Sequence, residues 1–209
     1  EAWRNAPPKP AAASRLRLAA PQSTRLANGL TILLSQRSGI PVVAANLVVR
    51  TGSDQNPIDK PGLASFMLAL LDQGTEKRSA LEMADAVAEL GARVTTSSTM
   101  DASFVRGQSL KKNFGPMLEI MADMALHPSF PPEEIERQRA SRLTQLVQQR
   151  GSATALASRA MASALYGDRH PYGLNELGSE ASVKAMSRSD IQGFWRQNFV
   201  ANNAALVVA

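Results

Sequence analysis

Histidine, cysteine and acidic side chains supply most catalytic and metal-binding groups, and this chain has few that work together. It has two histidines, His127 and His170, and no cysteine. A catalytic zinc ion needs about three protein ligands, and no third ligand is evident beside this pair. The lack of cysteine also excludes disulfides, thiolate zinc sites, iron–sulfur clusters and cysteine nucleophiles. We predict a structural or capping role for both histidines, because His127 precedes Pro128 at a helix end and His170 lies in a turn-like segment.

Other catalytic signatures are missing too. The sequence has neither a glycine-rich phosphate loop nor a Gly-x-Ser-x-Gly motif, which mark nucleotide-binding enzymes and serine hydrolases. Asp101 and Asp123 have no evident carboxylate partner, so no general acid–base pair is supported. The residue types alone therefore predict no reaction.

The charge pattern argues against nucleic acid as a partner. The formal net charge is +5, but aromatic residues make up only 5% of the chain. Binding to phosphate usually needs an unopposed basic patch with stacking aromatics. The densest basic stretch, Arg137, Arg139 and Arg142, is interleaved with glutamates at 133, 134 and 136, which is typical of a solvated helix face. No apolar run approaches the roughly 20 residues of a membrane span, so we predict none.

Composition and proline content suggest the domain organisation. The chain has 209 residues, of which 44% are hydrophobic and 20% charged, as in a globular domain. Residues 1–22 contain four prolines among many alanines, and we interpret them as an arm or linker. We expect a single α+β domain over residues 23–209. We also expect the chain to be a fragment of a longer polypeptide, because it lacks an initial methionine and stops within a predicted strand.

The strands of this domain are indicated by β-branched runs and turn residues. Asn28-Gly29 lies between residues 24–27 and 30–34 and predicts a hairpin. Residues 42–49 are apolar and β-branched, which predicts a central strand. Residues 92–98 and 101–108 predict a second hairpin, and residues 203–209 predict the last strand.

The helices alternate with these strands. Residues 63–71 are apolar nearly all round, which predicts a buried helix. Ser79 and Glu82 predict a capping box for the next helix, which should end at Gly91. Further helices are predicted over residues 114–126, 133–149, 154–165, 179–186 and 189–199. Hairpins mixed with helical pairs predict an α+β fold with a mainly antiparallel mixed sheet flanked by helices.

An ordered series of short phrases runs along residues 24–209. The phrases are Asn28-Gly29-Leu30, Gly52-Ser53, Gly62-Leu63-Ala64, Gly74-Thr75, Leu90-Gly91-Ala92, Pro128-Ser129-Phe130, His170-Pro171-Tyr172-Gly173 and Asn203 to Val208. Each phrase alone is weak, but their order is specific. The series resembles the zinc peptidases of the insulinase/pitrilysin/mitochondrial-processing-peptidase family, peptidase family M16. The resemblance implies the M16 peptidase fold, which is LuxS/metallohydrolase-like.

The resemblance also points to the positions where active members hold zinc. They carry His-x-x-Glu-His on the helix between the Gly-Leu-Ala and Gly-Thr phrases, with two histidines gripping the metal and a Glu as general base. Here Ser65 and Ala69 stand for the histidines and Leu68 for the Glu. The third ligand is a Glu on the later long helix, and the register from Phe130 places it at Gln145, with Thr144 as the alternative. Gln145 is expected on a polar side with Gln138, Arg142 and Gln149.

These replacements remove the chemistry that the family uses. Leucine and alanine have no lone pair to give, and a serine hydroxyl or an amide oxygen is a poor donor to zinc. The resemblance therefore implies no catalytic residue, no metal and no cofactor in this domain, with zinc held only by a catalytic partner half. The alternative is that Ser65, Leu68 and Ala69 are ordinary residues of a buried helix in an unrelated α+β domain, and that Gln145 is solvated surface.

An inactive copy in this family implies a function in assembly with an active one. We expect a non-catalytic M16 half that helps a zinc-bearing partner, on the same chain or as a separate subunit, to bind or enclose unfolded peptides. Bacterial relatives imply a periplasmic location. One alternative is a structural or assembly subunit that keeps the fold without proteolysis. Another is an active enzyme that uses other residues.

One segment is a candidate for peptide binding. In active relatives the substrate adds a strand to the sheet edge beside the zinc helix, and the matching segment here is Val94, Thr95, Thr96, Ser97 and Ser98. Its threonines and serines are polar on both faces, which suits an exposed edge. The alternative is an ordinary hydrated strand.

Overall fold

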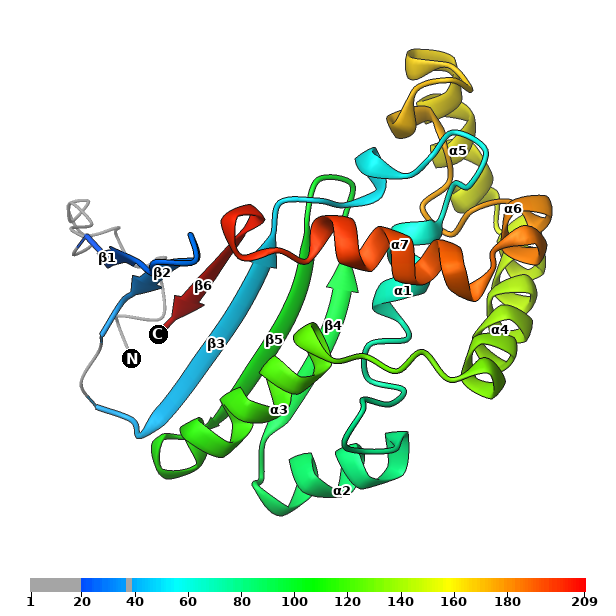
Figure 1. Ribbon diagram of the computed structural model, residues 1–209. Helices are drawn as coiled ribbons and strands as arrows, with labels where there is room; N and C mark the ends of the chain where they lie inside the picture. The colour runs from blue at the N-terminus through cyan, green and yellow to red at the C-terminus, as the bar shows by residue number, and fades with distance from the viewer. Residues whose placement is uncertain (1–19, 37–38) are drawn as a thin grey trace, which may run out of the picture.

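A computed structural model describes residues 20–36 and 39–209, and its centre is one six-stranded mixed sheet (Figure 1). The strand order is β1-β2-β6-β3-β5-β4, with β2 and β6 parallel and every other neighbouring pair antiparallel. The predicted α+β class with a mainly antiparallel sheet is therefore confirmed. The strands are β1 (Gln22–Arg25), β2 (Thr31–Leu34), β3 (Val42–Val49), β4 (Arg93–Ser98), β5 (Ser103–Leu110) and β6 (Ala204–Val208).

The strand predictions hold because local turn chemistry and apolar runs decide them. β3 covers the predicted residues 42–49 and lies between β6 and β5. The first hairpin turns at Gly29, whose φ of 93° is a left-handed conformation that favours glycine. β1 begins at Gln22, the last residue of the predicted arm. Residues 1–19 of that arm lie outside the described residues.

Seven helices accompany the sheet in the described part of the chain. They are α1 (Leu63–Leu68), α2 (Ala80–Glu89), α3 (Phe114–Leu126), α4 (Pro132–Arg150), α5 (Ala153–Tyr166), α6 (Glu180–Ala185) and α7 (Arg188–Asn198). α1 is shorter than the predicted 63–71, because the amides of Leu70 and Leu71 bond to carbonyls three residues back and tighten the end of the helix. The predicted capping box of Ser79 and Glu82 is present at the start of α2.

The core lies between one face of the sheet and the helices in front of it in Figure 1. Val105 of β5, Phe66 of α1 and Met117 of α3 are fully buried there. α3 packs so closely on β5 that a Cβ at Gly107 would lie 2.3 Å from the sulfur of Met121. At this position β5 has a glycine without a side chain, and α3 fills the space with the flexible side chains of Met117 and Met121.

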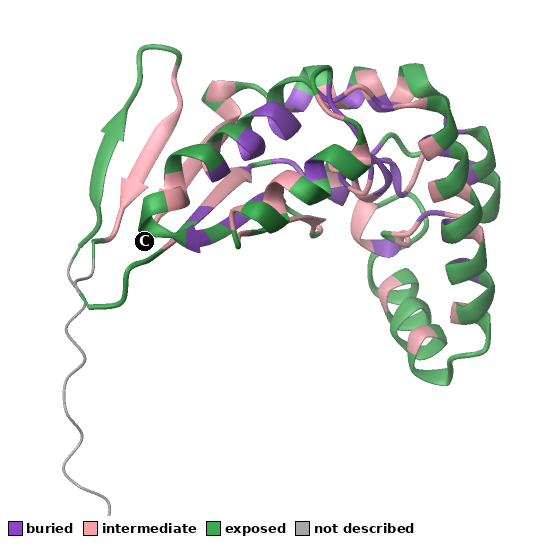
Figure 2. Ribbon diagram, turned by 90° about the horizontal axis from the view of Figure 1, so that it is seen from below, coloured by how far each residue is buried: buried purple, intermediate pink, exposed green. Residues whose placement is uncertain are grey.

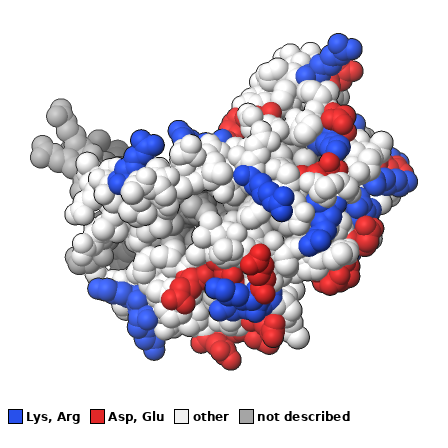
Figure 3. All heavy atoms as spheres, in the orientation of Figure 1, with Lys and Arg blue, Asp and Glu red and all other residues white. Residues whose placement is uncertain are grey.

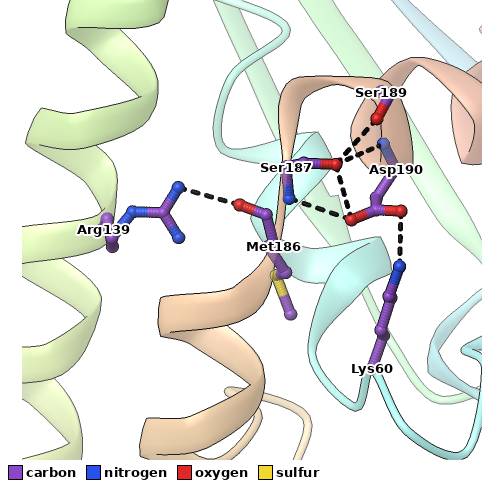
Figure 4. Close-up of polar contacts among 6 residues, drawn as sticks. All are labelled: Lys60, Arg139, Met186, Ser187, Ser189 and Asp190. Carbon is purple, nitrogen blue, oxygen red and sulfur yellow. Dashed lines mark hydrogen bonds and ion pairs between the residues drawn. The ribbon is translucent and has the colours of Figure 1, made fainter.

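Polar contacts join α4 to the segment between α6 and α7 (Figure 4). Arg139 of α4 donates to the carbonyl oxygen of Met186 at 2.8 Å and to that of Val183, which satisfies carbonyls at the end of α6. Ser187 caps the start of α7 in a capping box with Asp190, whose carboxylate also pairs with Lys60 at 2.5 Å. The expectation of a solvated face is therefore wrong for Arg139, whose side chain is only 15% exposed.

α5 differs from the other long helices because none of its residues is buried (Figure 2). The front face of the molecule mixes both signs of charge, with acidic residues over α2 and α3 (Figure 3). No helix in the described ranges is both long and apolar enough to cross a membrane.

Candidate functional site

Two glycines fix where α1 begins. Gly62 precedes the helix at φ 90°, and a Cβ there would lie 2.6 Å from the backbone nitrogen of Gly178. The chain before α6 therefore lies against the start of α1, which only two residues without side chains allow. The side chain of Asn56 accepts from the Ala64 amide at 2.8 Å and satisfies one of the free donors at this helix start.

The three predicted positions lie on α1 and at its C-terminal cap, Ala69, but they do not all share one face. Ser65 and Ala69 are the half-buried residues of the segment 62–70, and Leu68 is 1% exposed in the core. The Ala69 amide donates to the Ser65 carbonyl at 3.2 Å, so the two residues are one helical turn apart on one face. This face is the candidate site.

Arg142 of α4 occupies the space opposite Ser65. Its Nη1 donates to the Ser65 hydroxyl at 2.7 Å, and its Nη2 donates to the Ser65 carbonyl at 3.2 Å. The residue is 6% exposed, and this burial lowers the pKa of its guanidinium. Within the described residues it forms no ion pair with a carboxylate. The expectation that Arg142 belongs to a solvated polar face is wrong. Its side chain is buried, and the planar guanidinium can donate to the hydroxyl and carbonyl oxygens of Ser65 at the same time.

The structure does not bring Gln145 to this site. Gln145 is exposed on α4, with its amide 3.5 Å from the Ser141 hydroxyl, and the alternative Thr144 is exposed as well. The α4 residues that face inward near Ser65 are Arg142 and, one turn later, Leu146, which is 7% exposed. The assignment of a lost third ligand to Gln145 is not tested by this geometry and stays a prediction.

The side chains at this place do not fit a zinc ion. The Ser65 hydroxyl donates its hydrogen to the Glu176 carbonyl at 2.6 Å and accepts from Arg142 at 2.7 Å, so it is held by protein partners, and a neutral hydroxyl is a poor zinc ligand. Leu68 and Ala69 offer no donor atom, and the guanidinium would repel a divalent cation at close range.

The two histidines lie elsewhere and in structural positions. His127 is the C-terminal cap of α3, as predicted. His170 accepts from the Tyr172 amide at 3.2 Å and stacks on Tyr166 with ring centroids 5.4 Å apart. Across the residues that the structure describes, no group of three or more His, Cys, Asp or Glu side chains is placed to hold a metal ion.

The predicted peptide-binding strand, β4, forms one edge of the sheet beside α1. The Thr99 amide donates to the Ala102 carbonyl at 2.8 Å in register with β4 and β5. Hydrogen-bonded and non-hydrogen-bonded pairs alternate along an antiparallel pair, so Thr95 and Ser97 bond to β5. Val94, Thr96 and Ser98 therefore direct their backbone N–H and C=O groups to the outer edge, where no other described backbone group meets them.

The side chain of Thr96 ties this edge to α1. Its hydroxyl donates to the Leu68 carbonyl at 2.8 Å, near the helix end, where that oxygen also accepts from the Leu71 amide. The candidate site is thus continuous, running from the face of Ser65 and Ala69 to the outer edge of β4.

A groove away from this candidate site offers no reacting groups. An apolar groove of about 280 Å³ lies between α3, β3 and β6. Asn28 is the single polar side chain of its lining, which otherwise consists of residues such as Leu47, Met121 and Phe199. The groove therefore has the character of a packing surface.

A comparison with protein-family models decides the family. The model described as Insulinase (Peptidase family M16) matches residues 31–173. The chain belongs to this family. The M16 chain is 25% identical over 186 residues to an uncharacterized zinc protease of Rickettsia felis. The matched residues are 89% of this chain and 45% of the relative. It is 21% identical over 194 residues to a probable mitochondrial-processing peptidase subunit beta of Arabidopsis thaliana, 92% of this chain and 36% of the relative. It thus spans less than half the length of these curated relatives.

Solved structures share the fold. A structure described as a peptidase M16 inactive domain from Pseudomonas fluorescens superposes with a TM-score of 0.87 at 23% identity, over 91% of this M16 chain and 46% of the other. The periplasmic protease PqqL of Escherichia coli superposes with a TM-score of 0.81 at 17% identity, over 93% and 22% of the two chains. The M16 fold expected from the sequence is therefore confirmed.

Sequence reasoning missed Arg142 as a member of the site. A run of alternating arginines and glutamates is typical of a solvated helix, and nothing in it singles out one arginine. A signal was available at Ser65, because a buried helix of apolar residues with one serine invites a polar partner.

Proposed function

We propose that this M16 chain is a non-catalytic peptidase domain, which binds extended peptide at the β4 edge and helps a zinc-bearing partner half to bind or enclose it. The observation that carries the proposal is the outward set of backbone groups at Val94, Thr96 and Ser98, beside a helix face that has no metal-ligating side chain. A free edge next to an inert site suits substrate holding without cleavage.

The comparisons support this proposal from two sides. One solved structure with the same fold is described as an inactive M16 domain, and relatives named zinc proteases are about twice as long as the matched region. A catalytic half, on the same chain or as a separate subunit, would hold the zinc ion and the general base. A periplasmic location is part of the proposal, and the fold shared with PqqL, a periplasmic protease, supports it. The proposed partners do not include nucleic acid.

Thr96 allows a sharp test because its amide points away from β5. Thr96→Pro removes that amide without removing a β4–β5 hydrogen bond, and proline is tolerated at sheet edges. Thr96→Val is the matched control, because it loses the hydroxyl contact to Leu68 and keeps the amide. The probe is a fluorescent, unstructured peptide of alternating threonine and glutamine, about eight residues long as in a long strand. Binding is followed by anisotropy.

We expect Thr96→Pro to weaken binding about tenfold or more, since one outer hydrogen bond and its neighbours are lost, and Thr96→Val to bind nearly as the natural chain does. Hydrogen exchange gives a second readout that needs no variant: added peptide should protect the amides of Val94, Thr96 and Ser98. Equal affinity of all three proteins, or no protection at these amides, would remove the peptide-binding role. The assembly-subunit alternative would then take its place.

A further inference from the structure

The two faces of the sheet differ in what covers them and in charge. On the face that packs against the helices, Ala45, Val49 and Val105 are buried. On the opposite face, which we call the open face, none of the residues of the six strands is buried. Arg25, Arg93 and Arg106 are the only charged residues of the six strands. Strand pairing puts all three on the open face, because Arg25 is in register with Thr31, Arg106 with Thr95 and Arg93 with Gln108. The open face is therefore purely basic along its strands.

Two of these arginines lie close to the free edge. Arg93 is the first residue of β4 and is exposed. Arg106 of β5 reaches across to β4, where its Nη1 donates to the Ser97 hydroxyl at 3.1 Å. Its guanidinium lies 4.2 Å from the centre of the Phe104 ring, a contact that holds it over the strands. Neither arginine forms an ion pair with a carboxylate of residues 20–36 or 39–209.

A peptide strand paired with β4 would lie about 4.8 Å from it and would turn every second side chain to the open face. Those side chains would stand beside Arg93, Thr95 and Ser97, within reach of the Arg106 guanidinium. A carboxylate there gains a cationic partner, whereas an ammonium group meets like charge.

Resting on the proposed function, we propose that the β4 edge selects extended acidic peptides, with Arg93 and Arg106 recognising carboxylates at alternate positions on the open sheet face. The two arginines determine specificity, and the backbone of β4 supplies binding that is independent of sequence.

The test compares three peptides of alternating pattern, in which glutamine, glutamate or lysine alternates with threonine. We expect the glutamate peptide to bind about three- to tenfold more tightly than the glutamine peptide, and the lysine peptide to bind more weakly by a similar factor, as two partly exposed charge pairs allow. The double variant Arg93→Gln and Arg106→Gln should bind all three peptides with equal affinity. Arg159→Gln on α5 is the matched control, and it should keep the preference.

The outcomes separate the two proposals. If no peptide binds, the proposed function fails and this inference fails with it. If all three bind the natural chain equally, peptide binding stands and acidic selectivity is wrong. A single-stranded oligonucleotide of the same charge serves as a polyanion control. If it binds as tightly as the glutamate peptide and loses affinity in the double variant, the surface attracts any polyanion and the peptide assignment is overturned.

Discussion

Arg142 donates to both the hydroxyl and the backbone carbonyl of Ser65, although the two residues are 77 positions apart in the chain. The contact joins α4 to α1 at the place where active relatives are expected to hold their metal. The guanidinium of Arg142 is thus part of the packing between the two helices. Hydrogen bonds to Ser65, and not an ion pair with a carboxylate, offset the free energy that its burial costs.

Removing this cation should destabilise the fold. Arg142→Ala leaves the Ser65 hydroxyl without its donor and opens a void, and we expect a loss of about 2–3 kcal/mol in the free energy of unfolding. Gln145→Ala, on the exposed side of the same helix, should change it by less than about 0.5 kcal/mol. Urea unfolding of both variants measures the difference. An unchanged free energy of unfolding in Arg142→Ala would show that the contact contributes nothing to stability.

Restoring metal binding should depend on Arg142 more than on Gln145. In a background with Ser65→His and Ala69→His, Arg142→Glu replaces a repelling cation with a ligand that faces the site. Gln145→Glu adds a carboxylate that points to solvent and leaves the cation in place. We expect zinc to bind the first protein at least about tenfold more tightly, because close like charges cost more than about 1.4 kcal/mol in a partly buried site. Zinc calorimetry decides it, and equal affinities would contradict the placement of Arg142.

The capping carboxylate of α7 predicts a dependence of stability on pH. Partial burial alone would raise the pKa of Asp190, but the hydrogen bonds from Lys60 and Ser187 outweigh it and lower the pKa from 3.8 to about 2. Because the folded-state pKa is below the unfolded value, this contribution is complete above about pH 4 and is lost as the pH falls toward 2. Asp190→Asn should be less stable at neutral pH and should approach the natural chain at low pH. Urea midpoints that differ equally at every pH would rule this out.

Gly62, which precedes α1, should not tolerate a side chain. Gly62→Ala places a Cβ against the backbone of Gly178 at a φ of 90°, so both strain and collision oppose it. We expect a loss of about 2 kcal/mol or more. Gly193→Ala in α7, where a Cβ meets no atom within 4 Å, should stabilise by about 0.5–1 kcal/mol through helix propensity. Thermal unfolding of the pair checks the sign of each change, and two changes of the same sign would contradict this account.

The parts of the fold that follow from local chemistry were predictable, and the parts that depend on distant partners were not. The capping box of Ser79 and Glu82 and the strand over residues 42–49 are set by neighbouring residues, and both predictions hold. The assignment of Gln145 rests on the register along α4 and stays a prediction, because a shift of one residue turns a side chain by about 100° around a helix. Arg142 was interpreted as solvated because its partner, Ser65, lies on another helix. Local sequence carries no mark of such a pairing.

The free edge of β4 has a consequence for the chain in isolation. Val94, Thr96 and Ser98 present a template that a second copy of the same strand can also use, and two antiparallel β4 strands would fuse two sheets into one. The residues of the edge limit this, because threonine and serine hydroxyls keep it hydrated. An edge that stays free therefore needs protection against self-pairing, and the hydroxyl-rich sequence of β4 supplies part of it.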